Sequence, residues 1–172
     1  MPQPSVTLIL LLVPSAFIAF AQARAVSASS PQQQMVIRYF EQVLDQGKID
    51  VLEEMIDPDC AIHRPEGQLK GLPALRSMVA GRRANFSAFS TKIHDLIESG
   101  DRVVARLTHE GTASAPYRFR IGTQDVKGKK MTWDAIVIFR FDKGKIAEEW
   151  VSRDELGMLL TAGVLQSVNN QQ

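Results

Sequence analysis

The stretch that decides the fold is IVIFRFDKGKIAEEWVSRDELGMLLTAG, residues 136–163, which has the pattern of two strands followed by a helix. Apolar side chains alternate through residues 131–141, and Asp142, Lys143 and Gly144 form a tight-turn sequence before the next alternating run. We therefore predict an antiparallel hairpin. A terminal helix is expected directly after Asp154, ending at Gly163.

Outward from this hairpin, the hydrophobic period changes from helical to strand-like near Ser90. Helical spacing predicts helices within residues 31–47, 50–58 and 71–86, with a short strand between the last two. Further strands are predicted around the turn at residues 99–101 and within residues 117–121. Helices first, then antiparallel strands, then a last helix indicate an α+β domain. We expect a curved antiparallel sheet wrapped around about three helices, with a pocket on its concave face.

The 172-residue chain has a formal net charge of +1, so it lacks the basic field that a nucleic-acid partner would require. Residues 1–25 contain an uncharged apolar run followed by Ala-x-Ala triplets, which is typical of a signal peptide. We therefore expect a secreted or periplasmic protein without membrane contact after cleavage. An uncleaved anchor is disfavoured because Pro14 and Ser15 interrupt the run. Residues 26–34 are predicted as a linker, 35–165 as the domain and 166–172 as a polar tail.

Candidate functional side chains lie in or directly after three of the predicted strands. His109 and Trp133 each lie on the apolar face of an alternating run, where a histidine is either a core-edge residue with one partner or a functional group. In the last strand, alternation places Ile146, Trp150 and, if the strand continues, Asp154 on one face. Asp154 also precedes an apolar helix and suits an N-cap. Both interpretations stay open: a helix cap, or an acid/base group beside a pocket.

Other catalytic motifs are missing from the sequence. The three histidines, His63, His94 and His109, do not have a metal-ligand spacing, and the single cysteine, Cys60, has no partner for a disulfide or a metal site. Glycine-rich phosphate loops and a G-x-S-x-G elbow are also missing. The two functions that remain possible are acid/base catalysis and simple ligand binding.

Several segments together resemble the SnoaL-like polyketide cyclase family, within the nuclear-transport-factor-2-like fold. They are VIRYFEQVLDQGKIDVLEEMIDPDCAIHRP, LKGLPALRSMV, LIESGDRVVARLTHEGT and the opening stretch, and the resemblance covers residues 35–163. It implies a cone closed by three helices around a pocket, and a homodimer formed through the outer face of the sheet. It also implies acid/base closure of a polyketide without a metal or organic cofactor.

By position in the family's motifs, the resemblance assigns the general acid/base role to Asp154, and His63 corresponds to a histidine expected to assist it. The chain departs from the family in its GTASAP segment, where Ala113 replaces a frequent histidine, and in the longer loop after it. These changes remodel the pocket mouth. The residues expected to bind the substrate are Tyr39, His109, Trp133 and Trp150.

The expected function is acid/base catalysis of the cyclase, isomerase or hydrolase type on an apolar small molecule that contains a carbonyl group. With Asp154 as the base, Asp154→Asn would abolish turnover and leave folding intact. The alternative is a non-catalytic small-molecule-binding or dimerisation module.

Overall fold

A computed structural model describes residues 28–166 of the chain. The predicted signal peptide and residues 167–172 of the predicted tail lie outside this range, so export from the cell stays a prediction, as does the homodimer. Within the described range, no helix is long and apolar enough to cross a membrane.

The helices occupy the predicted regions. Helix α1 begins at Pro31, inside the predicted linker, because Ser30 caps it: the Gln33 backbone N–H donates to Ser30 Oγ at 3.1 Å, and Pro31 suits the first turn. The helical elements are α1 (Pro31–Arg38), the π-helical η1 (Tyr39–Asp45), the 3-10 turn η2 (Ile49–Val51), α2 (Leu52–Met55), α3 (Gly71–Asn85) and α4 (Glu155–Thr161).

The main sheet has six strands in the order β2-β1-β8-β7-β4-β3, and a separate pair is formed by β5 and β6. Only the β1–β8 pairing in the main sheet is parallel, so the sheet is mixed. The predicted turn joins β7 and β8, with Lys143 at φ 50° and Gly144 at φ 78°, the left-handed conformations that a tight hairpin turn needs. The strands are β1 (Ile56–Arg64), β2 (Gly67–Lys70), β3 (Phe86–Ser99), β4 (Arg102–Ala113), β5 (Tyr117–Phe119), β6 (Gly122–Gln124), β7 (Lys130–Asp142) and β8 (Lys145–Arg153).

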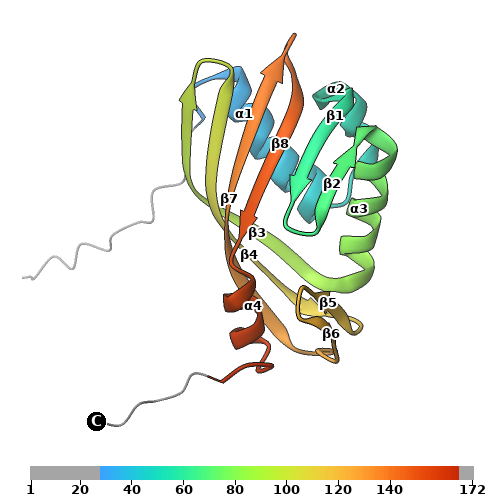
Figure 1. Cartoon of the computed structure of the whole chain (residues 1–172). Helices are drawn as coiled ribbons and strands as arrows, with labels where there is room; N and C mark the ends of the chain where they lie inside the picture. Colours follow the sequence, from blue (N-terminus) through green and yellow to red (C-terminus); the bar gives the residue numbers. More distant parts are fainter. Residues whose placement is uncertain (1–27, 167–172) are drawn as a thin grey trace, which may run out of the picture.

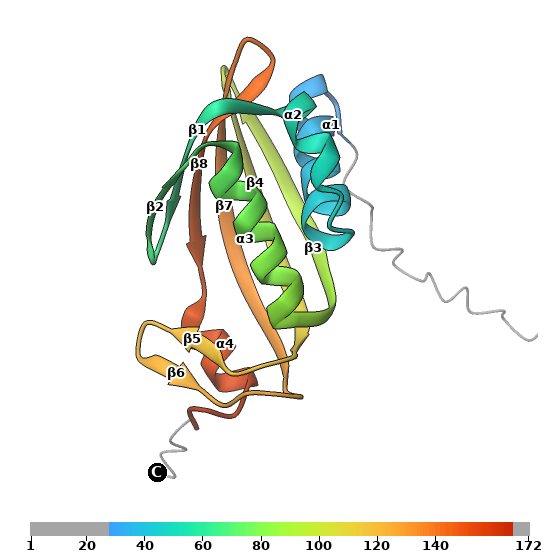
Figure 2. The ribbon, with the colours of Figure 1, turned by 90° about the vertical axis from the view of Figure 1, so that its right-hand side faces the viewer.

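The sheet is strongly curved, and the helices lie against its concave face (Figure 1). Figure 2 shows α3 and the α1–η1 helix on the same side of the sheet, with α4 and the β5–β6 hairpin at one end. Buried side chains from η1, α3 and the concave strand faces form the main core. A second buried cluster, which includes Phe86, Trp133 and Met158, lies where α4 and the β5–β6 hairpin approach the sheet. The expected α+β architecture is confirmed.

A β-bulge at Ala147 changes the face on which each later side chain of β8 lies. Arg140 pairs with Glu148, but Phe141 pairs with Ile146, so Ala147 is an extra residue without a partner. One extra residue reverses the alternation of a strand. Ile146 and Glu149 are therefore both buried on the concave side, and Trp150 lies on the opposite face. The prediction that Ile146 and Trp150 share a face is wrong for this reason.

Candidate functional site

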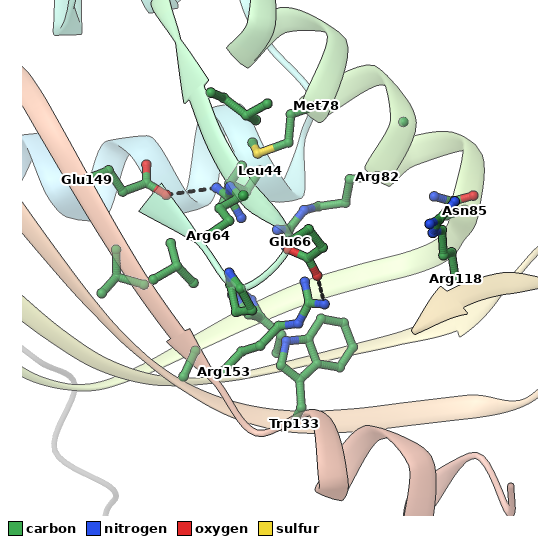
Figure 3. A pocket seen from close by; sticks show the side chains of 18 of the residues that line it. Leu44, Arg64, Glu66, Met78, Arg82, Asn85, Arg118, Trp133, Glu149 and Arg153 are labelled. Carbon is green, nitrogen blue, oxygen red and sulfur yellow. Dashed lines mark hydrogen bonds and ion pairs between the residues drawn. The ribbon is translucent and has the colours of Figure 1, made fainter. Parts of the chain in front are cut away.

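A cavity of about 950 Å³ opens between the concave face of the sheet, helix α3, the β1–β2 hairpin and the β5–β6 hairpin. It lies between the two buried clusters and takes lining residues from both. Part of its wall is apolar, formed by residues that include Phe40, Leu44, Phe86, Trp133 and Val137. Another part is charged, and its members include Arg64, Glu66, Arg82, Glu149 and Arg153 (Figure 3).

Glu149 is the central carboxylate of this wall and is only 2% exposed. The Tyr39 hydroxyl donates to one of its oxygens at 2.9 Å, and Arg64 Nη2 donates to the other at 2.8 Å. Burial and the negative charge of Glu149 raise the pKa of Tyr39 well above its ordinary value, so the hydroxyl stays a donor. A buried carboxylate with both oxygens engaged is suited to positioning Arg64.

Two further arginines reach the cavity from other elements. Arg153, at the end of β8, forms an ion pair with Glu66 in the β1–β2 turn. Arg82, in the last turn of α3, lies 4.7 Å from the ring centroid of Phe89. Within residues 28–166, Arg82 forms no ion pair with a carboxylate. Burial, and next the positive charge of Arg64, lower the pKa of Arg82 to about 10, so it remains charged at neutral pH.

His109 lines the cavity and is held by a chain of hydrogen bonds. Thr91 donates from its backbone N–H to Asp45 Oδ2 at 3.0 Å and from its hydroxyl to Asp45 Oδ1 at 2.7 Å. His109 Nδ1 lies 2.9 Å from the same hydroxyl oxygen. Because the single hydroxyl proton is directed to Asp45, Nδ1 must carry its own proton and donate. The lone pair of the ring is therefore on Nε2, which has no hydrogen-bond partner in the described part of the chain.

The charge state of His109 follows from its surroundings. The side chain is 4% exposed, and burial, Arg82 and Arg64, in that order, lower its pKa well below the ordinary 6.5. The rings of Phe40, Phe89 and Trp133 lie around it, with centroids 5.2–6.1 Å away. At neutral pH His109 is thus an uncharged imidazole with an available Nε2 lone pair.

The lowered pKa of His109 predicts a pH dependence of stability. The unfolded chain binds the proton more readily, so the contribution of neutral His109 is fully present above about pH 6.5 and is lost as the pH falls toward the folded-state pKa. Between about pH 7 and 5, we expect the free energy of unfolding to fall more steeply for the wild type than for His109→Asn. Urea denaturation at several pH values measures both slopes, and equal slopes would contradict a buried neutral histidine.

The structure brings only part of the predicted site together. His109 and Trp133 both line the cavity, with ring centroids 5.4 Å apart. Tyr39 is fully buried behind the wall and reaches it only through Glu149. His63 and Trp150 lie on the opposite face of the sheet, where their rings stack at 5.3 Å and His63 Nε2 lies 2.8 Å from Glu148 Oε1. The substrate-binding and catalytic roles of all these residues stay predictions.

Asp154 occupies the helix-cap position. Its side chain is exposed, and Oδ1 accepts a hydrogen bond from the Gly157 backbone N–H at 2.8 Å. Asp154 is not among the residues that line the cavity. Of the two interpretations left open by the sequence, the structure displays the cap, and the general-base role of Asp154 stays a prediction without a cavity contact to support it.

The contribution of this helix cap to the free energy of unfolding can be measured. Asp154→Ala removes the hydrogen bond to Gly157 and is expected to lower the free energy of unfolding by about 1 kcal/mol. Asp154→Asn is expected to retain nearly all of this energy, because asparagine caps helices as well as aspartate does. Chemical denaturation of the two variants gives the comparison. Equal losses in both would show that the charge, and not the cap, stabilises α4.

Sequence reasoning missed Asp45, Thr91, Arg82 and Glu149. Arg82 had a usable signal, because it continues the three- and four-residue spacing of Leu75, Met78 and Val79 and so falls on the apolar face of α3. Glu149 was hidden by the bulge in β8.

The geometry defines a class of protein: a cone-shaped α+β domain of the nuclear-transport-factor-2-like fold with a small-molecule cavity. The sequence profile described as SnoaL-like polyketide cyclase matches residues 34–161. The chain therefore belongs to the SnoaL-like polyketide cyclase family. No curated protein sequence matches it.

Solved structures support the fold. TsrD from Streptomyces laurentii is 23% identical with a TM-score of 0.69, over 81% of this chain and 99% of that one. IdmH from Streptomyces antibioticus is 21% identical with a TM-score of 0.63, over 77% and 98%. A SnoaL-like polyketide cyclase from Agrobacterium tumefaciens is 21% identical with a TM-score of 0.62, over 73% and 93%. At these identities the similarity establishes the fold alone.

Proposed function

We propose that the chain is a cyclase- or isomerase-type enzyme that removes a proton from the carbon next to a carbonyl group, with His109 as the general base. The observation that carries this proposal is the chain Asp45–Thr91–His109, which fixes one tautomer and leaves Nε2 available in the cavity. An oriented neutral imidazole is a common general base.

The proposed proton transfer uses only groups that line the cavity. The C–H bond breaks, its proton passes to His109 Nε2, and the electron pair forms an enolate. Arg64 lines the same cavity, is held by Glu149, and carries a positive charge that already acts on His109. That charge would stabilise the enolate oxygen. Return of the proton to a different carbon of the conjugated enolate, or to the opposite face of the same carbon, gives isomerisation. In a cyclase reaction, the enolate attacks a second carbonyl, and the new alkoxide takes the proton from His109.

The apolar wall supports a substrate with a substantial hydrophobic body. Phe86 and Trp133 have ring centroids 5.5 Å apart and face the cavity together with Phe40 and Leu44. Such a surface binds rings and acyl chains by burial of apolar area. The second candidate function is a binding module without catalysis. Such a module would bind its ligand at the same apolar surface, but it would not require an oriented His109.

The test is deuterium exchange at the α carbon of α-tetralone, an apolar bicyclic ketone, followed by NMR in D₂O. Enzyme-dependent exchange is expected for the wild type and for Asp154→Asn. Exchange that depends on Asp154 and not on His109 would instead support the base predicted from the sequence. Binding of the ketone without any exchange would support the binding module.

A further inference from the structure

We propose that the ligand of this cavity carries a carboxylate group, which Arg82 receives while the apolar part of the ligand lies against Trp133 and Phe86. This proposal names the class of ligand that binds in the same cavity, and it therefore rests on the proposed function. Its test measures binding alone, so the two can fail separately.

The positive and negative charges of the cavity wall do not balance. Arg64 is paired with Glu149 at 2.8 Å, and Arg153 is paired with Glu66. Arg82 lines the same cavity without a carboxylate partner in residues 28–166. Of the three wall arginines that have a buried nitrogen without a hydrogen-bond partner (Arg64, Arg82 and Arg153), Arg82 alone lacks a carboxylate in the described part of the chain, so this group of three holds one positive charge in excess. A charge placed at a buried site is normally paired, so the missing partner is expected to come from the ligand.

Several donor atoms of the cavity wall also lack hydrogen-bond partners within residues 28–166. Four buried side-chain nitrogen or oxygen atoms in the described range have no hydrogen-bond partner, and three of them are arginine nitrogens of this wall: Arg64 Nε, Arg82 Nη1 and Arg153 Nε. Unsatisfied buried donors are costly and rare. Figure 3 shows these three arginines reaching toward the same space from β1, α3 and β8. Their convergence supplies several donors to one acceptor group.

A carboxylate fits the cavity better than other anions do. One uncompensated guanidinium matches a single negative charge, and its planar fork matches the two oxygens of a carboxylate. A phosphate dianion would bring a second charge close to Glu66 and Glu149, which remain in the wall. Arg118 also lines the cavity and is exposed, so it would attract an anion of either kind toward the site. The large apolar share of the wall further favours an amphiphilic acid over a small polar ion.

The experiment compares naphthalene-2-acetate with its primary amide, which has almost the same shape and no charge. Isothermal titration calorimetry at neutral pH should show that the wild type binds the carboxylate tighter than the amide by on the order of 10- to 100-fold. Equal affinities, or no binding of the carboxylate, would overturn the proposal. This comparison needs no variant, so it does not depend on how a substitution affects folding.

Variants then show which residue is responsible for the preference for the carboxylate over the amide. Arg82→Met keeps an unbranched apolar stem and removes the guanidinium, and we expect it to abolish the preference for the carboxylate while the affinity for the amide is unchanged. The matched control is Arg76→Met on the same helix, because Arg76 pairs with Glu53 at 2.7 Å and does not line the cavity. It should retain the preference in full. If Arg82→Met lowered the affinities for the acid and for the amide equally, Arg82 would have a packing role and the proposal would be overturned.

A competition experiment separates the carboxylate from phosphate. Excess inorganic phosphate, with the ionic strength matched by chloride, should leave the affinity for naphthalene-2-acetate unchanged. Displacement of the acid by phosphate, to the same extent in the wild type and in Arg76→Met, would indicate a phosphate site and contradict the choice of a carboxylate.

Discussion

Replacing His109 by asparagine should lower the rate of α-tetralone deuteration by about 10²- to 10⁴-fold, the usual contribution of a general base. Asparagine carries an amide N–H at the same number of bonds from the backbone as Nδ1, so it can still donate to the Thr91 hydroxyl. It has no counterpart of Nε2. The variant therefore removes the proposed base and retains its anchoring hydrogen bond, which now joins His109 Nδ1 and Thr91 Oγ1 at 2.9 Å.

The chain contains a matched control for this experiment. On the convex face of the sheet, Thr108 donates to Asp134 Oδ1 at 2.6 Å, and His94 Nε2 lies 2.8 Å from the same hydroxyl oxygen. This is the same Asp–Thr–His arrangement, but His94 does not line the cavity. His94→Asn should leave deuteration unchanged. Full exchange by folded His109→Asn, or equal losses in both variants, would contradict the assignment of His109.

Replacing Glu149 by alanine should lower the free energy of unfolding by about 3–5 kcal/mol, the cost of breaking a buried ion pair. The substitution removes the acceptor of both Arg64 Nη2 and the Tyr39 hydroxyl, and Tyr39 is fully buried. A buried charge and a buried hydroxyl are then left without partners. Chemical denaturation measures this loss of stability.

The neighbouring Glu148 provides the control for Glu149. It lies on the opposite face of β8, where it pairs with His63 and Arg140 and is 22% exposed. Glu148→Ala should cost at most about 1 kcal/mol, as partly exposed ion pairs usually do. Adding Arg64→Met to Glu149→Ala should recover part of the stability, because the uncompensated charge is removed. A loss by Glu149→Ala as small as that of Glu148→Ala would contradict the buried network.

The fold could be predicted from the sequence because its signals are local. The turn at Lys143 and Gly144, the helix after Asp154 and the change of period near Ser90 each depend on a few adjacent residues. Turn chemistry, capping and hydrophobic period act over these short distances. The resemblance to a family added the cone closed by three helices, and the profile match over residues 34–161 confirms the family.

The site could be predicted only in part, for a different physical reason. His109 and Trp133 were found because each lies on the apolar face of a regular strand. Trp150 and Glu149 exchanged faces because one extra residue at Ala147 reverses the alternation, and no local pattern in the sequence marks that bulge.

The sequence by itself determined the α+β architecture and the hairpin, left the cap at Asp154 as one of two interpretations, and predicted His109 and Trp133 as pocket residues. The tertiary structure alone decided that Asp45 orients His109 through Thr91, and that Glu149 pairs with Arg64 while Arg82 has no carboxylate partner within residues 28–166. These contacts join residues 18 to 85 positions apart in the chain. Such pairings depend on strand register and on the packing of helices against the sheet, which the whole chain fixes together.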